Sequence, residues 1–438
     1  MKQLVFIPLL VIVIACLNVV PATSQDARQD TAENKVFTLA DCVSAALENN
    51  PQIRYSQAEI TAREYSLESS KKDLYPSLFF QYGYTNTPDT TFIYGTDNYF
   101  NYSFSIEQPL YEGRSLITGV ELGKLNLEFS KAGMTQTQND IVVSVHEAYY
   151  NLLKAKKFEE VANQTVEERK AHLKDAKAFF KAGLIPKNDM LQSGVQLANA
   201  EIADIRAQNV TSMAQAKLNT LLRRPVDSEI AVADILKYEP SEVSWDQAIE
   251  MAKKHRPELK QSEIVIEQAN KNIIMTKAPY LPSVKVSASY MRQGDDPIFS
   301  EDFPVGPSDV TTIMATLNWR FWAWGQGKDK VGVAEYNVKK AKESKVELQD
   351  NIVLQVRQAY LDIKESEYNI GVTEKAIEQA EEDYRINQSR YQAQLSTTTD
   401  VLDAETRLAR ARINHFDALY NYRIALMKFA WATGTLSL

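Results

Sequence analysis

Cysteine is scarce in this chain, with two residues among 438. Cys16 lies in an apolar stretch at the N-terminus, and Cys42 falls on the apolar face of a short predicted helix. A single cysteine beyond the N-terminal stretch cannot form an internal disulfide, so we exclude a disulfide-stabilised fold. We expect Cys42 to be a small buried side chain.

An excess of basic residues is also missing, because the formal net charge is -8. A protein that binds nucleic acid usually carries a basic stripe, and here Lys and Arg are evenly scattered, so we exclude a nucleic-acid partner. No Gly-x-Ser-x-Gly elbow and no Gly-rich phosphate loop is present. The sequence therefore predicts no catalytic residues, no cofactor and no metal site, since the four histidines lack the spacing of metal ligands: His146, His172, His255 and His415.

Long apolar runs are confined to one place, residues 4–20, which follow Lys2. This layout is typical of an export signal and not of a retained membrane span. Two ways of processing it remain open. Ala22-Thr23-Ser24 has the small-x-small pattern of ordinary cleavage, which makes 1–24 the signal peptide, whereas Val13-Ile14-Ala15-Cys16 resembles a lipobox that ends on a lipidated cysteine. Either way, the protein is expected to leave the cytoplasm.

Proline is absent from two long stretches, since none of the 15 prolines lies between Pro109 and Pro186 and none follows Pro307. Residues typical of helices fill these stretches, and their apolar positions advance mostly by threes and fours, as in coiled coils. We predict two long helix hairpins, 115–222 and 328–433. Their first helices are on the order of 100 Å long at 1.5 Å per residue.

The chain does contain an internal duplication. Residues 140–149 (DIVVSVHEAY) return at 351–360 (NIVLQVRQAY), and residues 191–202 (LQSGVQLANAEI) return at 402–413 (LDAETRLARARI). The unit is much longer than the repeats of solenoid proteins. We therefore divide the chain after the signal into two structural repeats: 25–230 and 231–438.

Between the helices, each repeat has two segments in which apolar and polar residues alternate. Phe100, Tyr102 and Phe104, for example, alternate with Asn101 and Ser103. Such segments are strands with one apolar face, and their length suits a tilted membrane-spanning strand of roughly 9–11 residues. The predicted strands are 77–84, 99–107, 283–291 and 311–321.

These strands favour a transmembrane barrel. Aromatic residues gather where the strands meet the helices, as in an interfacial girdle: Tyr75, Tyr111, Trp319, Trp322 and Trp324. Four strands cannot close a barrel, because the smallest membrane barrels have about eight, and an open edge cannot face lipid. We therefore expect an oligomer that contacts membrane lipid. A soluble sandwich with one solvated face is the alternative.

The ordered plan of export signal, helices, strand pairs and long hairpins, repeated twice, resembles the TolC-like outer membrane efflux proteins. The segments 108–114 (QPLYEGR) and 399–404 (TDVLDA) add to the resemblance. It implies a mainly α protein in the outer membrane, whose homotrimer closes a 12-stranded β-barrel from four strands per protomer. The long helices would continue this barrel as a coiled-coil tunnel in the periplasm.

The resemblance also implies functional residues. Asp400 and Asp403, three apart at a helix start, would form acidic rings at the tunnel constriction and favour cations. Asp400 could instead serve only to cap the helix or to complement its N-terminal dipole, and both roles remain open. Tyr391 and Asp189 would be the gating contacts that hold the tunnel shut. Gln394 departs from the family, which has glycine in this turn, and glycine permits positive φ.

The expected function is therefore passive. The chain would be the exit duct of a tripartite efflux or type I secretion system, fed by an inner-membrane transporter through a periplasmic adaptor protein. The alternative, from another class, is a periplasmic coiled-coil scaffold or tether that forms no channel.

Overall fold

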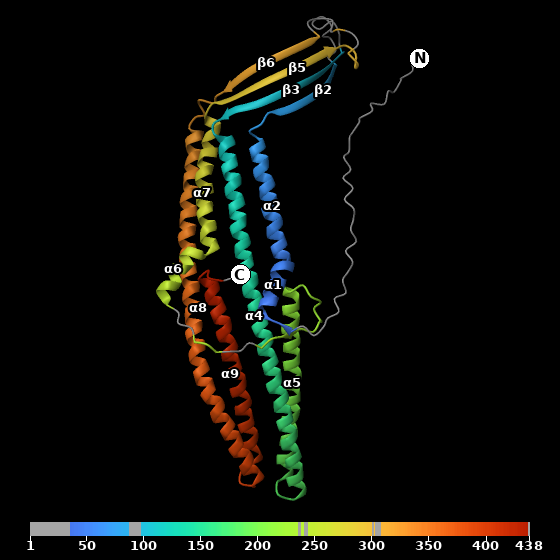
Figure 1. Ribbon diagram of the computed structural model, residues 1–438, viewed down its shortest axis with the longest axis vertical. Coiled ribbons are helices and arrows are strands. Elements are labelled where there is room, and N and C mark those ends of the chain that lie inside the picture. The colour runs from blue at the N-terminus through green and yellow to red at the C-terminus, as the bar shows by residue number, and fades with distance from the viewer. Residues whose placement is uncertain are drawn as a thin grey trace, which may run out of the picture.

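The chain forms a long bundle of helices that carries a four-stranded sheet at one end (Figure 1). The computed structural model describes residues 36–86, 98–234, 238–240, 244–299, 302 and 308–436. The predicted signal peptide at 1–24, with Cys16, lies outside the described residues. Among the described helices, none is both long and apolar enough to cross a membrane.

The helices and strands follow one another in the same order in each half. The first half contains β1 (Val36–Phe37), α1 (Leu39–Asn49), α2 (Pro51–Lys72), β2 (Ser77–Asn86), β3 (Asn98–Glu112), α4 (Ser115–Lys181) and α5 (Lys187–Leu221). The second half contains β4 (Ala231–Val232), α6 (Trp245–His255), α7 (Pro257–Lys277), the 3-10 turn η1 (Ala278–Tyr280), β5 (Ser283–Gly294), β6 (Asp309–Asn318), α8 (Gln326–Gln392) and α9 (Thr398–Ala432).

The two helix hairpins have equal dimensions. Helices α4 and α8 each contain 67 residues, and α5 and α9 each contain 35. Both hairpins turn through a residue in the left-handed conformation, Gly183 with φ 75° and Gln394 with φ 60°. The duplication seen in the sequence therefore extends to the length of every long helix.

The sheet is antiparallel, with strand order β2-β3-β5-β6. Strand β3 carries a bulge between Pro109 and Tyr111. The predicted end of the last strand at residue 321 is wrong, because β6 ends at Asn318. Asn318 pairs with Ser283, the first residue of β5, so no partner strand is left for Trp319 and the residues after it.

The main core surrounds the middle of α4, where α1 and the ends of α5 and α9 meet it (Figure 1). Tyr149 is fully buried there, and its hydroxyl donates to the Ala233 carbonyl at 2.5 Å, beside the parallel pair β1–β4. Cys42 is buried in the same core, and burial raises the pKa of its thiol to about 11. The thiol is therefore un-ionised at neutral pH and unreactive.

On the side away from the sheet, the long helices pack in one row (Figure 1). Helix α4 contacts α5 on one side and α9 on the other, and α9 contacts α8 in turn. The row α5-α4-α9-α8 therefore joins the two hairpins along the α4–α9 seam. Helices α5 and α8 are its outer members.

Candidate functional site

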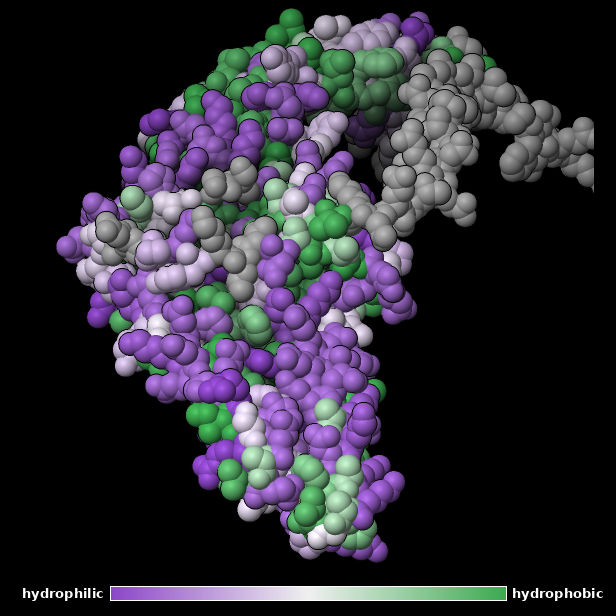
Figure 2. Space-filling model, turned by 60° about the horizontal axis from the view of Figure 1, so that its bottom comes forward, coloured by the Kyte–Doolittle hydropathy of each residue, from purple (hydrophilic) through white to green (hydrophobic). Residues whose placement is uncertain are grey.

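One face of the sheet carries mostly apolar side chains on all four strands. Paired residues of neighbouring strands, such as Phe80 and Phe104, point to the same side. Leu78 is 80% exposed and Ile313 is 78% exposed. In Figure 2, hydrophobic side chains gather at the end that carries the sheet, while most of the helical surface is hydrophilic. A large exposed apolar face of this kind marks contact with a membrane or another protein.

The other face of the sheet is mostly polar. The residues that alternate with the apolar ones include Gln81, Ser103 and Ser105. Lys285 of β5 forms an ion pair with Glu107 of β3 at 3.2 Å on this face. One face thus suits lipid and the other suits water, as in the wall of a channel.

The predicted interfacial aromatics lie between the sheet and the helices. Trp319 follows β6, and its indole N–H donates to the Tyr280 carbonyl at 3.2 Å. Trp322 and Trp324 pack edge to face, and Trp324 is 89% exposed. Tyr75 precedes β2, and Tyr111 lies near the end of β3. All five side chains are exposed where the strands give way to helices.

Asp400 and Asp403 are exposed in the first turns of α9, at the tip of the second hairpin. Asp400 completes a capping box with Thr397, whose backbone N–H and hydroxyl both donate to the carboxylate at 2.8 Å. These hydrogen bonds lower the pKa of Asp400. Asp400 is therefore ionised at neutral pH and fixed in orientation, so the capping role that the sequence left open is present.

Tyr391 lies at the end of α8 and is buried against α4, where its ring contacts those of His172 and Phe179. Its hydroxyl accepts a hydrogen bond from Thr398 at 3.4 Å. Burial raises the pKa of Tyr391, the hydrogen bond from Thr398 opposes the rise, and the negative charges of Asp175 and Asp189 add to it. Tyr391 thus packs the second hairpin onto the first through its ring, and its hydroxyl bonds to Thr398 of its own hairpin and not to Asp189.

The turn at Gln394 has the geometry that glycine usually provides. The Leu395 N–H donates to the Arg390 carbonyl at 2.7 Å, just as the Leu184 N–H donates to the Phe179 carbonyl at 2.9 Å in the other hairpin. This backbone bond closes both helices with the same motif. The turn at Gln394 therefore has the same closing hydrogen bond as the turn at Gly183.

A buried ion pair on the α4–α9 seam was not predicted from the sequence. Arg169 of α4 is 5% exposed and Glu405 of α9 is 1% exposed, and the guanidinium Nε lies 3.0 Å from the carboxylate. The duplication contained a signal for it. The second repeat has buried Ala380 in the place of Arg169, and the first repeat has Gly194 in the place of Glu405. Charged residues therefore replace small ones at packed positions.

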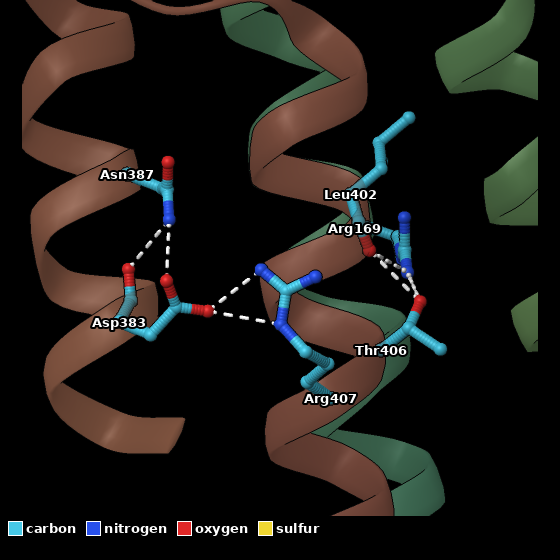
Figure 3. A network of polar contacts seen from close by, with 6 residues as sticks. All are labelled: Arg169, Asp383, Asn387, Leu402, Thr406 and Arg407. Carbon is cyan, nitrogen blue, oxygen red and sulfur yellow. Dashed lines mark hydrogen bonds and ion pairs between the residues drawn. The ribbon is translucent and has the colours of Figure 1, made fainter. Parts of the chain in front are cut away.

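A second charged contact holds α9 to α8. The Arg407 side chain donates twice to Asp383, at 2.7 and 3.0 Å, and Asn387 donates to the same carboxylate at 2.9 Å (Figure 3). The beginning of α9 is thus tied to α8 on one side and to α4 on the other. In the described parts of the chain, no group of three or more His, Cys, Asp and Glu could hold a metal ion.

Comparison with known proteins places these features in a wider group. A family model for outer membrane efflux proteins matches residues 42–222 and 248–435, one segment in each repeat. Outer membrane protein TolC of Vibrio cholerae is 22% identical over 402 residues, which cover 91% of each protein. Alkaline protease secretion protein AprF of Pseudomonas aeruginosa is 21% identical over 415 residues, which cover 91% of this chain and 84% of AprF.

The fold is also found among solved structures. The outer membrane channel CmeC of Campylobacter jejuni matches with a TM-score of 0.80 at 15% identity, over 90% of this chain and 85% of that one. The long helices and the four antiparallel strands therefore form a TolC-like fold, as the sequence predicted.

Proposed function

Because the chain belongs to the family of outer membrane efflux proteins, we propose that three copies close one continuous duct through which cargo leaves the cell. Members of this family are outer membrane channels without enzymatic activity. The observation that carries the proposal is a sheet with one apolar face and two open edges. The duct would conduct passively, supplied by an inner-membrane transporter and a periplasmic adaptor protein.

The open edges are those of β2 and β6. Within the described residues, each of these strands has a neighbour on one side only. Unpaired backbone N–H and C=O groups cannot face hydrocarbon, so the β2 edge of one copy must pair with the β6 edge of the next. Three copies of four strands give the 12-stranded barrel that the family resemblance implies. The exposed aromatics below the sheet would then meet the lipid headgroups.

The helices supply a second argument for assembly. On α9, Leu402 is buried, whereas its counterpart on α5, Leu191, is exposed. On α4, Tyr150 is 6% exposed, whereas its counterpart on α8, Leu361, is 45% exposed. The α4–α9 seam is thus closed within one chain, and the equivalent apolar faces of α5 and α8 lack a cover. Packing α8 of one copy on α5 of the next covers both.

The tips of the hairpins would form the constriction of this duct. Asp400 and Asp403 of three copies would make two stacked rings of carboxylates, which favour cations. The capping bonds of Asp400 support this role, because they keep its charge in a fixed place. Tyr391 and Asp189 would hold the second hairpin against the first in the narrow state.

Substitution of the acidic residues tests the proposal. The variant Asp400→Asn with Asp403→Asn should lower the ratio of cation to anion permeability several-fold in planar bilayers, because the rings lose their charge. Glu343→Gln, which removes an exposed carboxylate higher on α8, is the control and should leave the ratio unchanged.

The oligomeric state and the conductance of the unmodified protein are measured first. Outer membrane fractions should contain a trimer that dissociates on heating, and the purified trimer should conduct ions. Monomers that show no affinity for lipid and no conductance would refute the duct and favour a periplasmic tether.

A further inference from the structure

The two hairpins of one chain are joined by a charge pair that water does not reach. Arg169 and Glu405 face each other across the α4–α9 seam, both almost completely buried, with 3.0 Å between the guanidinium Nε and the carboxylate. A buried pair of this kind is costly to desolvate and is weak evidence for stability by itself. The pair is therefore better explained by a role in positioning the helices than by a general gain in stability.

Arg169 does more than pair with Glu405. Its Nη2 also donates to the Leu402 carbonyl at 3.0 Å and to the Thr406 hydroxyl at 2.9 Å (Figure 3). These acceptors lie on either side of Asp403, within the first turns of α9. The guanidinium therefore donates to two acceptors of α9 through Nη2 and lies beside the Glu405 carboxylate as an ion pair without a hydrogen bond to it. The point charge of a lysine cannot reproduce this planar arrangement.

These contacts of Arg169 belong to the α4–α9 seam. At the equivalent places of the other repeat stand Ala380 and Gly194, which have neither charge nor hydrogen-bonding side chains. The seam that α8 and α5 would form between two copies therefore has no such contact at these places. Within one chain, the start of α9 is held by Arg169 of α4 and by Asp383 of α8.

We propose that Arg169 is a positioning residue that sets the width of the constriction by holding the start of α9 on α4. This inference rests on the duct described above and adds a residue that the acidic rings depend on. Asp403 lies in the sequence between Leu402 and Thr406, the two residues of α9 that Arg169 binds, so movement of this turn would move the carboxylate rings. Loss of the grip should let the turn move away from α4 and widen the opening.

The test measures position and conductance separately. Thr399, which is exposed beside Asp400, is replaced by Cys and spin-labelled in the full-length trimer. Cys42 is buried and does not compete for the label. In the otherwise unaltered protein, the distances between the three labels should be narrowly distributed. Arg169→Met should lengthen and broaden these distances and raise single-channel conductance several-fold.

Three further variants make the result specific. Arg169→Lys keeps a positive charge beside Glu405 but lacks the Nη2 group that donates to Leu402 and Thr406, so its label distances should also be broad. Arg169→Met with Glu405→Met leaves no unpaired buried charge, so this variant should assemble even if the single variant does not, and should show the same broad distances. Arg410→Met removes an exposed arginine of α9, one turn beyond Thr406, and should keep the narrow distribution.

Unchanged label distances in an assembled variant without Arg169 would overturn the proposal. An equal change in Arg410→Met would overturn it too, because the loss of any arginine on α9 would then suffice. The label distances report the position of α9 even in a protein that conducts nothing. The label distances therefore test the role of Arg169. The conductance of the unaltered trimer tests separately whether the protein forms a duct.

Discussion

Glu405 is a buried carboxyl whose pKa is shifted far enough to be tested by experiment. Burial raises the pKa of its carboxyl, Arg169 opposes the rise and Glu168 adds to it, and the pKa that results is about 7. The other ionisable groups around this part of the seam are His172 on α4, Glu381 and Tyr384 on α8, and Arg412 on α9. Glu405 therefore changes charge near neutral pH.

The raised pKa gives stability a definite pH dependence. The folded chain binds the Glu405 proton more tightly than the unfolded chain, whose carboxyl has the ordinary pKa of 4.5. This contribution to stability is fully present below pH 4.5 and is lost as the pH rises through 7. Relative to Glu405→Gln, which stays neutral, the natural chain should lose about 3 kcal/mol between pH 4 and pH 8.

Thermal unfolding of the two proteins at a series of pH values measures this loss. Glu382→Gln removes an exposed carboxylate on α8 and should not abolish the dependence. A difference between natural chain and Glu405→Gln that stayed constant from pH 4 to pH 8 would show that Glu405 ionises like an exposed carboxyl.

At the scale of secondary structure, the two hairpin turns offer a matched pair of positions. Gly183 and Gln394 are equivalent and both have positive φ, which costs a residue other than glycine about 1–2 kcal/mol. A Cβ at Gly183 would meet no atom within 4 Å, so only the backbone opposes a side chain there.

Exchanging these residues should have opposite effects. Gly183→Ala should destabilise the first turn by about 1 kcal/mol, and Gln394→Gly should stabilise the second by somewhat less, because glycine also gains freedom in the unfolded chain. Hydrogen exchange of the Leu184 and Leu395 amides, which close the two turns, reports each effect locally. Effects of the same sign in both turns would contradict the left-handed geometry.

The sequence was informative about elements and less so about what joins them. Absence of proline and alternation of apolar residues are local patterns, and they predicted the long helices and the four strands. The end of β6 was wrong because Trp319 continues the alternation, whereas the strand ends where its partner begins at Ser283. Alternation describes a face and contains no information about the length of a neighbour.

In the candidate site, too, the features that depend on neighbouring residues in the sequence were predictable and the contacts between repeats were not. Asp400 follows Thr397 by three residues, so its capping role was visible as a local pattern. The grip of Arg169 on α9 joins residues from different repeats, and no local pattern reports a contact between them. Only comparison of the repeats, which shows Ala380 in the place of Arg169, would have marked the position as unusual.

At the scale of the whole molecule, the proposed seam between copies makes a sharp prediction. Ile202 is exposed on α5, in line with Leu191 and Val195. Ile202→Asp would bury a charge in an apolar seam, which costs several kcal/mol, and should convert the trimer to monomers. Ala203→Asp adds the same charge to the same helix away from this line and is the control.

Light scattering of the detergent-solubilised proteins gives the number of copies directly. A normal trimer from Ile202→Asp would show that α5 and α8 do not meet in the way proposed.

The equal lengths of the two hairpins have a consequence for how the protein can evolve. Six identical single repeats, arranged in a ring, would have one kind of contact all the way round, and any mutation would alter every contact at once. Fusion of two repeats in one gene frees alternate contacts to diverge. A buried pair such as Arg169 and Glu405 can then arise at half of the positions, while Ala380 and Gly194 stand at the other half.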